Sequence, residues 1–465
     1  MAGLASALLL SASLAGPIAP SPGAVVDPVR CGPEGRFSYA LYAPKAFDPG
    51  RAWPILYVFD PRSRGRFALD LFREAAERHG FLIASSNDTR SDTDDARPSL
   101  QAVQAMWEDT HQRLPLAPGR ALAAGFSGGA RLSTVLGTAA GGQLFGVFAA
   151  GAGFSSPEAI PKDTPFVVFA TAGRHDFNYY ELRGLDQRLG ALALPHAVEF
   201  FDGGHAWPPA DVIDRGLDWL ELQAMRRGRR ARDEAWLAAW EGAALARAAD
   251  LEARGLLLEA GEAYRQAAAA LEGLRESPAG THAARLEARA DVRRERERRA
   301  DLDRREEAWI AARYRMLERL LPGGEPAPLL AELLRELEVD RVRRESRSAA
   351  DAYERDAWRR RLESLRVQAR FYIPQRLLAQ GEFARAAVSL GVAVALEPES
   401  APARYDLACA LARGGRRKDA LAELQRAVES GFTDATHMAA DEDLKALRET
   451  PEFQALLRRL GAPAP

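Results

Sequence analysis

The feature that most constrains the fold is a regular alternation of short apolar runs with amphipathic segments across residues 31–227. The apolar runs have the length of buried strands and are bounded by turn residues, whereas the segments between them show helical periodicity. The expected strands are residues 37–42, 54–59, 81–86, 121–125, 145–150, 165–171 and 197–201, and the expected helices are residues 67–79, 99–114, 130–138, 179–189 and 209–225. This order predicts an α/β fold with a doubly wound, mostly parallel sheet.

A different pattern begins at about residue 228, where strand signals stop and Ala, Leu, Arg and Glu recur with helical periodicity. Phe371, Leu377, Gly381, Ala386, Leu390 and Ala393 are matched 34 residues later by Tyr405, Leu411, Gly415, Ala420, Leu424 and Ala427. This spacing resembles the tetratricopeptide repeat, a helix–turn–helix unit of the same length. We therefore expect an all-α second half, with one weak repeat within residues 228–368 and further repeats and a capping helix within 369–465.

The first 26 residues carry no charged side chain and contain a short apolar run that ends in small residues. Ser13-Leu14-Ala15 has the small-x-small form of a secretory cleavage site, although no basic residue precedes the apolar run. The run is too short to span a membrane. Residues 1–26 thus predict a signal peptide and a periplasmic or secreted protein, with a disordered Ala-rich N-terminus as the alternative.

Charge and cysteine content exclude several classes of partner. The 63 basic and 65 acidic residues nearly cancel to a net charge of −2, which argues against nucleic acid or an anionic membrane as the main partner. The two cysteines, Cys31 and Cys409, lie far apart and offer neither a disulfide framework nor metal-ligand spacing. We expect no metal and no organic cofactor.

One motif has the pattern expected around a nucleophilic serine. Gly125-Phe126-Ser127-Gly128-Gly129 follows an expected strand and leads directly into an expected helix, which is the setting of a G-x-S-x-G nucleophile elbow. A serine at such a sharp turn requires residues almost without side chains two positions before and after it. The N–H of Gly128, near the helix N-terminus, would point at a developing oxyanion. The structural alternative is a glycine-rich helix start packed against a strand.

Two further residues follow Ser127 in the chain order nucleophile, acid, histidine. Asp176 lies just past the expected strand 165–171, and His205 lies just past the expected strand 197–201. His205 can then act as general base, with Asp176 holding its tautomer. Competing residues are expected to be structural, to face solvent or, for His175, to line the pocket; they are Asp186, Asp202, Asp211, Asp214, His79, His111, His175 and His196.

These stretches resemble a known family. Residues 33–227 are similar to a compact α/β-hydrolase without an inserted lid, especially the secreted carboxylesterases of the polyhydroxybutyrate-depolymerase and feruloyl-esterase type, and also dienelactone hydrolases. The similarity lies in Tyr42-Ala43-Pro44 and in residues 53–60, 125–129, 173–176 and 204–208. By position, the resemblance implies Ser127 as nucleophile, Asp176 as acid and His205 as general base.

The chain departs from this family after the expected strand that ends at residue 59. Relatives commonly place a His-Gly pair there, and the amide that follows completes the oxyanion hole. This chain has Asp60-Pro61-Arg62-Ser63 instead, and Pro61 has no N–H to donate. We therefore expect Gly128 as one oxyanion donor and Arg62, Ser63 or a side chain as the second.

Together these observations predict a serine hydrolase that cleaves carboxylic esters through an acyl-enzyme on Ser127. The substrate would be a small-molecule or polymer ester, and the helical repeats would bind a protein or polymer. Two alternatives stay open at this stage. The hydrolase fold can be an inert scaffold whose repeats bind a protein partner, or the same triad can serve a serine peptidase.

Overall fold

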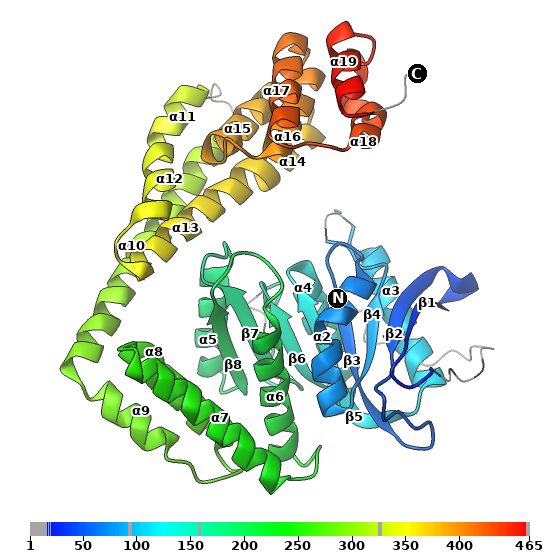
Figure 1. Ribbon diagram of the computed structural model, residues 1–465, viewed down its shortest axis with the longest axis vertical. Coiled ribbons are helices and arrows are strands. Elements are labelled where there is room, and N and C mark those ends of the chain that lie inside the picture. The colour runs from blue at the N-terminus through cyan, green and yellow to red at the C-terminus, as the bar shows by residue number, and fades with distance from the viewer. Residues whose placement is uncertain are drawn as a thin grey trace. The chain divides into compact units, whose positions relative to one another are not determined.

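An eight-stranded sheet forms the centre of the N-terminal part of the computed structural model (Figure 1). The strands lie in the order β1-β2-β4-β3-β5-β6-β7-β8; β1 and β2 are antiparallel to their neighbours and the remaining pairs are parallel. Their bounds are β1 Val25–Cys31, β2 Phe37–Tyr42, β3 Trp53–Phe59, β4 Leu82–Ser86, β5 Leu116–Phe126, β6 Leu144–Ala150, β7 Val167–Gly173 and β8 His196–Phe201. The mostly parallel sheet confirms the predicted α/β class.

The structure describes residues 16, 18, 20–91, 95–156, 160–323 and 328–461. Most of the expected signal peptide, residues 1–15 together with 17 and 19, lies outside the described residues. Val25 and Val26, which the sequence assigned to that N-terminal segment, are the first residues of strand β1. Strand β1 was not predicted, because Asp27 and Pro28 interrupt its apolar pattern and most of its residues are not buried.

Helices cover both faces of the sheet, as the predicted βαβ units require. Helices α3 (Arg97–Arg113), α4 (Gly128–Ala140) and α5 (Tyr179–Ala191) contribute to one buried apolar cluster. Helices α2 (Gly65–His79) and α6 (Ala210–Arg226) contribute to a second apolar cluster. Because each cluster also takes alternate residues of the central strands, the sheet is buried on both sides and its parallel strands are almost entirely apolar.

Three helices follow the sheet and pack with it. They are α7 (Glu234–Ala253), α8 (Leu257–Leu271) and α9 (Ala279–Glu287). Leu237, Ala270 and Leu271 belong to the same apolar cluster as α2 and α6, and α7 to α9 share a small core of their own. The chain accordingly divides into two compact units, Met1–Glu297 and Arg298–Pro465.

The C-terminal unit is entirely helical over its described residues. Its helices are α10 (Ala290–Glu318, which begins before the boundary), α11 (Leu330–Glu336), α12 (Val339–Ser348), α13 (Ala352–Val367), α14 (Ile373–Ala379), α15 (Phe383–Leu396), α16 (Ala401–Arg413), α17 (Arg417–Glu429), α18 (Ala435–Ala440) and α19 (Pro451–Arg459), with a π-helical turn, Gln368–Tyr372, before α14 and a 3-10 helix, Glu442–Leu447, before α19. No helix in the described part of the chain is long and apolar enough to cross a membrane.

Most of the repeated positions identified from sequence form the packing surfaces of two helical pairs, α14–α15 and α16–α17. Phe371, which the sequence matched with the buried Tyr405, is instead exposed and lies in the π-helical turn before α14. Leu377, Ala386, Leu390 and Ala393 and their counterparts Leu411, Ala420, Leu424 and Ala427 are all buried in one apolar cluster. Each pair turns at a glycine with a positive φ angle, +74° at Gly381 and +77° at Gly415. The left-handed backbone at these two turns explains why glycine recurs at this point of the repeat.

The C-terminal unit also contains a buried ion pair that allows a test of its packing. Arg360 and Glu306 are 2% and 0% exposed, and the guanidinium donates to both carboxylate oxygens, at 3.0 and 2.7 Å. Glu306→Ala leaves a buried cation without this partner, so we expect the free energy of unfolding to fall by about 3–5 kcal/mol. Urea unfolding measures this change. Glu332→Ala, which removes an exposed partner of Arg319, is the control and should unfold close to wild type; equal effects of the two variants would contradict the prediction.

Candidate active site

The turn between β5 and α4 has the backbone of a nucleophile elbow. Ser127 has φ 53° and ψ −118°, a conformation that few non-glycine residues adopt. A Cβ atom on Gly125 would lie 2.1 Å from the carbonyl oxygen of Gly129, and one on Gly129 would lie 2.0 Å from the carbonyl oxygen of Phe59. Both glycines are therefore required by the close approach of three backbone segments, which is the reason proposed from the sequence.

The structure brings the three residues predicted from chain order into one hydrogen-bonded line. His205 Nε2 lies 3.0 Å from Ser127 Oγ, and His205 Nδ1 lies 2.9 Å from both carboxylate oxygens of Asp176. Because an ionised carboxylate only accepts hydrogen bonds, Nδ1 carries the proton and Nε2 is left to accept from the Ser127 hydroxyl. This arrangement lets His205 take a proton from Ser127 while Asp176 orients the ring.

Backbone contacts hold the acid and the histidine loops against each other. Asp176 is buried, and its Oδ1 also accepts a hydrogen bond from the Asn178 N–H at 2.8 Å. The His175 N–H donates to the carbonyl of Gly203 at 2.9 Å, two residues before His205. Both loops begin where adjacent parallel strands, β7 and β8, end. Their carboxyl ends meet at one edge of the sheet, which is where such folds place functional groups.

Two phenylalanine rings flank the imidazole. The ring centroids of Phe126 and Phe177 lie 4.6 and 4.3 Å from that of His205. This contact was not predicted from the sequence, although each phenylalanine is next to a triad residue along the chain. Both rings pack against His205 and restrict its rotation.

The predicted second oxyanion donors already have acceptors. The Arg62 N–H donates to Asp60 Oδ1 at 2.9 Å, and the Ser63 N–H donates to the carbonyls of Asp60 and Thr89 at 3.3 and 3.0 Å. Either residue would have to release such a bond to bind an oxyanion, so their role stays a prediction. Gly128 is the first residue of α4, where N–H groups have no intrahelical acceptor.

Asp60, the residue directly after β3, is a completely buried carboxylate. Burial by itself raises the pKa of Asp60, but hydrogen bonds from Arg64, Trp207 and the Arg62 N–H outweigh burial and lower the pKa below its usual value. The ionised form therefore stabilises the folded loop at neutral pH. This contribution is lost only as the pH falls through the lowered pKa.

The competing histidines are placed elsewhere. His196 Nε2 lies 3.2 Å from Asp186, His79 Nε2 lies 3.0 Å from Asp218, and His111 Nδ1 lies 2.9 Å from the Trp107 carbonyl. His175 faces Asp202 at 3.6 Å. Burial lowers the pKa of His111, which favours its neutral form. These contacts match the structural roles expected for His79, His111 and His196.

Among the described residues, one group of side chains has potential ligand atoms close enough together to hold a metal ion. Cys409, Asp441 and Asp443 have donor atoms within 4.8 Å of one another. However, Asp441 Oδ2 already accepts the Tyr405 hydroxyl at 2.8 Å, and burial, with nearby carboxylates, raises the pKa of the Cys409 thiol. A protonated thiol is a poor ligand, so this cluster fits a structural contact better than a metal site.

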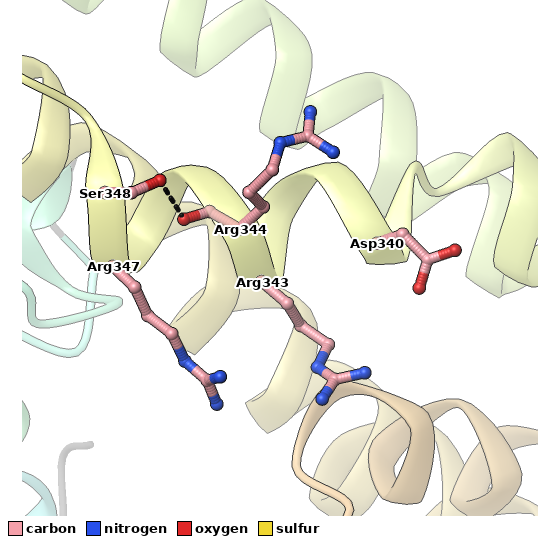
Figure 2. Close-up of a pocket in the computed structure, with 5 residues that line it drawn as sticks. All are labelled: Asp340, Arg343, Arg344, Arg347 and Ser348. Carbon is pink, nitrogen blue, oxygen red and sulfur yellow. Dashed lines mark hydrogen bonds between the residues drawn. The ribbon is translucent and has the colours of Figure 1, made fainter.

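A charged cavity of about 390 Å³ lies on helix α12 in the C-terminal unit (Figure 2). It is lined by Asp340, Arg343, Arg344, Arg347 and Ser348, and the Ser348 hydroxyl donates to the Arg344 carbonyl at 2.9 Å. Pockets that hold small organic ligands are mostly apolar. This charged cavity is therefore not the expected pocket for an ester, and it contains none of the triad residues.

Comparisons with known proteins match the two parts of the chain separately. A tetratricopeptide repeat family model matches residues 377–440, which confirms the predicted repeats over those residues. The fluorophosphonate-binding serine hydrolase F of Staphylococcus aureus is 13% identical, with 43% of this chain and 99% of that chain covered and a TM-score of 0.37. A ferulic acid esterase is 16% identical, with coverages of 43% and 98% and a TM-score of 0.36. A truncated carbohydrate esterase from gut microbiota is 13% identical, with coverages of 45% and 100% and a TM-score of 0.37. A comparison with curated protein sequences finds no match.

The crowding at the elbow can be tested with a single methyl group. Gly129→Ala would force a Cβ against the Phe59 carbonyl oxygen, which belongs to a buried strand and cannot move aside. We expect a loss of about 1–3 kcal/mol in stability, measured as the free energy of unfolding. Gly142→Ala is the control, because nothing lies within 4 Å of its added Cβ. Equal stability of the two variants would contradict this account of the elbow.

Proposed function

We propose that this chain is a serine hydrolase that cleaves carboxylic esters through an acyl-enzyme on Ser127. The observation that carries the proposal is the line from Asp176 through His205 to Ser127, with contacts of 2.9 and 3.0 Å. The strained backbone at Ser127 adds to it, because strain of this kind persists where the surrounding structure requires it. The motifs shared with carboxylesterases favour esters over peptides as substrates.

The proposed reaction has two steps. Ser127 Oγ attacks the ester carbonyl carbon while His205 Nε2 takes its proton, and the Gly128 N–H stabilises the oxyanion. His205 then gives this proton to the departing alcohol as the carbon–oxygen bond breaks, leaving an acyl group on Ser127. In the second step, His205 removes a proton from water, which attacks the acyl carbon. His205 returns this proton to Ser127 Oγ as the bond between Oγ and the acyl carbon breaks, which releases the carboxylic acid and restores the Ser127 hydroxyl.

The repeats have a separate part in this proposal. Residues 377–440 match a repeat family and form helical pairs, so they supply a surface on which a protein or polymeric substrate can dock. The proposed periplasmic or secreted location rests on residues 1–26 alone.

Labelling with a fluorophosphonate probe tests the nucleophile directly. Wild-type protein should be modified at Ser127, and Ser127→Ala and His205→Ala should not be labelled at an appreciable rate. Both variants should lower kcat for ester hydrolysis by about four to six orders of magnitude, since triad members act as a unit. His196→Ala is the matched control, because His196 also contacts an aspartate but lies away from Ser127. It should label as wild type does.

A panel of p-nitrophenyl esters with graded acyl length, alongside chromogenic peptides, separates the remaining alternatives. Turnover of esters with little turnover of peptides supports the proposal. Preferential turnover of peptides would assign the same triad to a peptidase. Folded protein that neither labels nor hydrolyses any ester or peptide would contradict enzymatic activity and favour an inert scaffold.

A further inference from the structure

Asp60 is a buried carboxylate that accepts four hydrogen bonds, and it has no role in the reaction proposed above. Each of its oxygens accepts two hydrogen bonds. Oδ1 accepts from the Arg62 N–H and from Arg64 Nε, both at 2.9 Å. Oδ2 accepts from Arg64 Nη2 at 2.8 Å and from Trp207 Nε1 at 2.9 Å. Because Asp60 is fully buried, a shift of its carboxylate would lose hydrogen bonds that water cannot replace, so these four bonds hold Asp60 in one position.

Trp207 connects Asp60 to the histidine loop. It lies two residues after His205 and 147 residues after Asp60, and its indole N–H donates to Asp60 Oδ2. The Trp207 ring packs at 5.6 Å against both Phe72, on α2, and Phe126, beside Ser127. Phe126 in turn packs against His205. The indole is therefore fixed by one hydrogen bond and by two aromatic contacts.

The loop that bears His205 is thus held from two sides. Before His205, the Gly203 carbonyl accepts the His175 N–H of the acid loop. After His205, Trp207 is bound to Asp60, which directly follows β3. The loop after β3 also contains Arg62 and Ser63, the predicted oxyanion donors. The Asp60–Trp207 bond consequently joins the loop expected to bind the oxyanion to the loop that carries the general base.

We infer that Asp60 is a positioning residue, which acts through the Trp207 indole N–H to keep His205 between Asp176 and Ser127. Its effect on turnover rests on the proposed function, whereas its effect on the His205–Asp176 contact does not. Displacement of catalytic groups by about 1 Å can lower a rate about 100-fold. Loss of the Asp60–Trp207 bond should therefore reduce kcat and leave KM nearly unchanged, because neither side chain is proposed to bind substrate.

The test is a double-mutant cycle with Asp60→Asn, Trp207→Phe and the combined variant. The amide offers one acceptor oxygen where the carboxylate has two, and phenylalanine removes the indole N–H. Each single variant should lower kcat about 10- to 100-fold per active site titrated with fluorophosphonate. The combined variant should be no slower than the slower single variant, because both changes are expected to lower kcat through the same Asp60–Trp207 bond. Single variants with wild-type kcat, or effects that multiply, would overturn the inference.

Asp109→Asn is a closely matched control. Asp109 is also buried, is paired with an arginine four residues later (Arg113), and accepts a hydrogen bond from an aromatic residue, Tyr39, at 2.7 Å. It lies on α3 and has no contact with the histidine loop in these hydrogen bonds. It should lower thermal stability as Asp60→Asn does, yet retain kcat. A parallel fall in kcat for Asp109→Asn would show that general destabilisation explains the Asp60 variants.

A second measurement needs no turnover. An imidazole N–H bonded to a carboxylate gives a low-field proton resonance, assigned to His205 by its absence in His205→Ala. Loss or marked broadening of this resonance in Asp60→Asn and in Trp207→Phe, but not in Asp109→Asn, supports the inference. An unchanged resonance in both variants would overturn it. Wild-type protein that shows the resonance but hydrolyses nothing would contradict the proposed function while leaving this result decisive for Asp60.

Discussion

The close approach of three backbone segments at the end of β5 is the constraint on which the rest of the N-terminal unit depends. The first turn of α4 lies against the end of β3, and only glycines fit at positions 125 and 129. This contact places Ser127 at a strained turn above the sheet edge, within reach of loops from β7 and β8. The parallel sheet brings the carboxyl ends of these strands together, so the serine fixed at the elbow lies beside the acid and histidine loops.

Both units pair buried charged groups with hydrogen-bonding partners. In the N-terminal unit, the buried carboxylates Asp60 and Asp176 receive several directed hydrogen bonds each, and both lie beside the triad or within it. In the C-terminal unit, charged side chains are mostly paired along and between helices, and Arg360 with Glu306 is an example that is fully buried.

Local patterns were sufficient to predict most of the secondary structure. Strand and helix periodicities located the elements of residues 37–226, and the 34-residue spacing located the buried faces of the repeats, because each signal depends on neighbours along the chain. Strand β1 was missed because it is an edge strand with a proline and little burial. The packing of α7 to α9 with the sheet was also not predicted, since a helical pattern shows that a face is apolar but not which surface covers it.

For the candidate site, the sequence by itself determined which residues to propose, Ser127, Asp176 and His205, and their order along the chain, because each follows a strand whose end can be recognised locally. Only the tertiary structure decided what surrounds them: the two phenylalanines beside His205, the acceptors already bound to the N–H groups of Arg62 and Ser63, and the four hydrogen bonds to Asp60. The physical reason is distance along the chain. Asp60 and Trp207 are 147 residues apart in the chain and come into contact because the loops after β3 and β8 pack together. No local sequence pattern around either residue identifies the other as its partner.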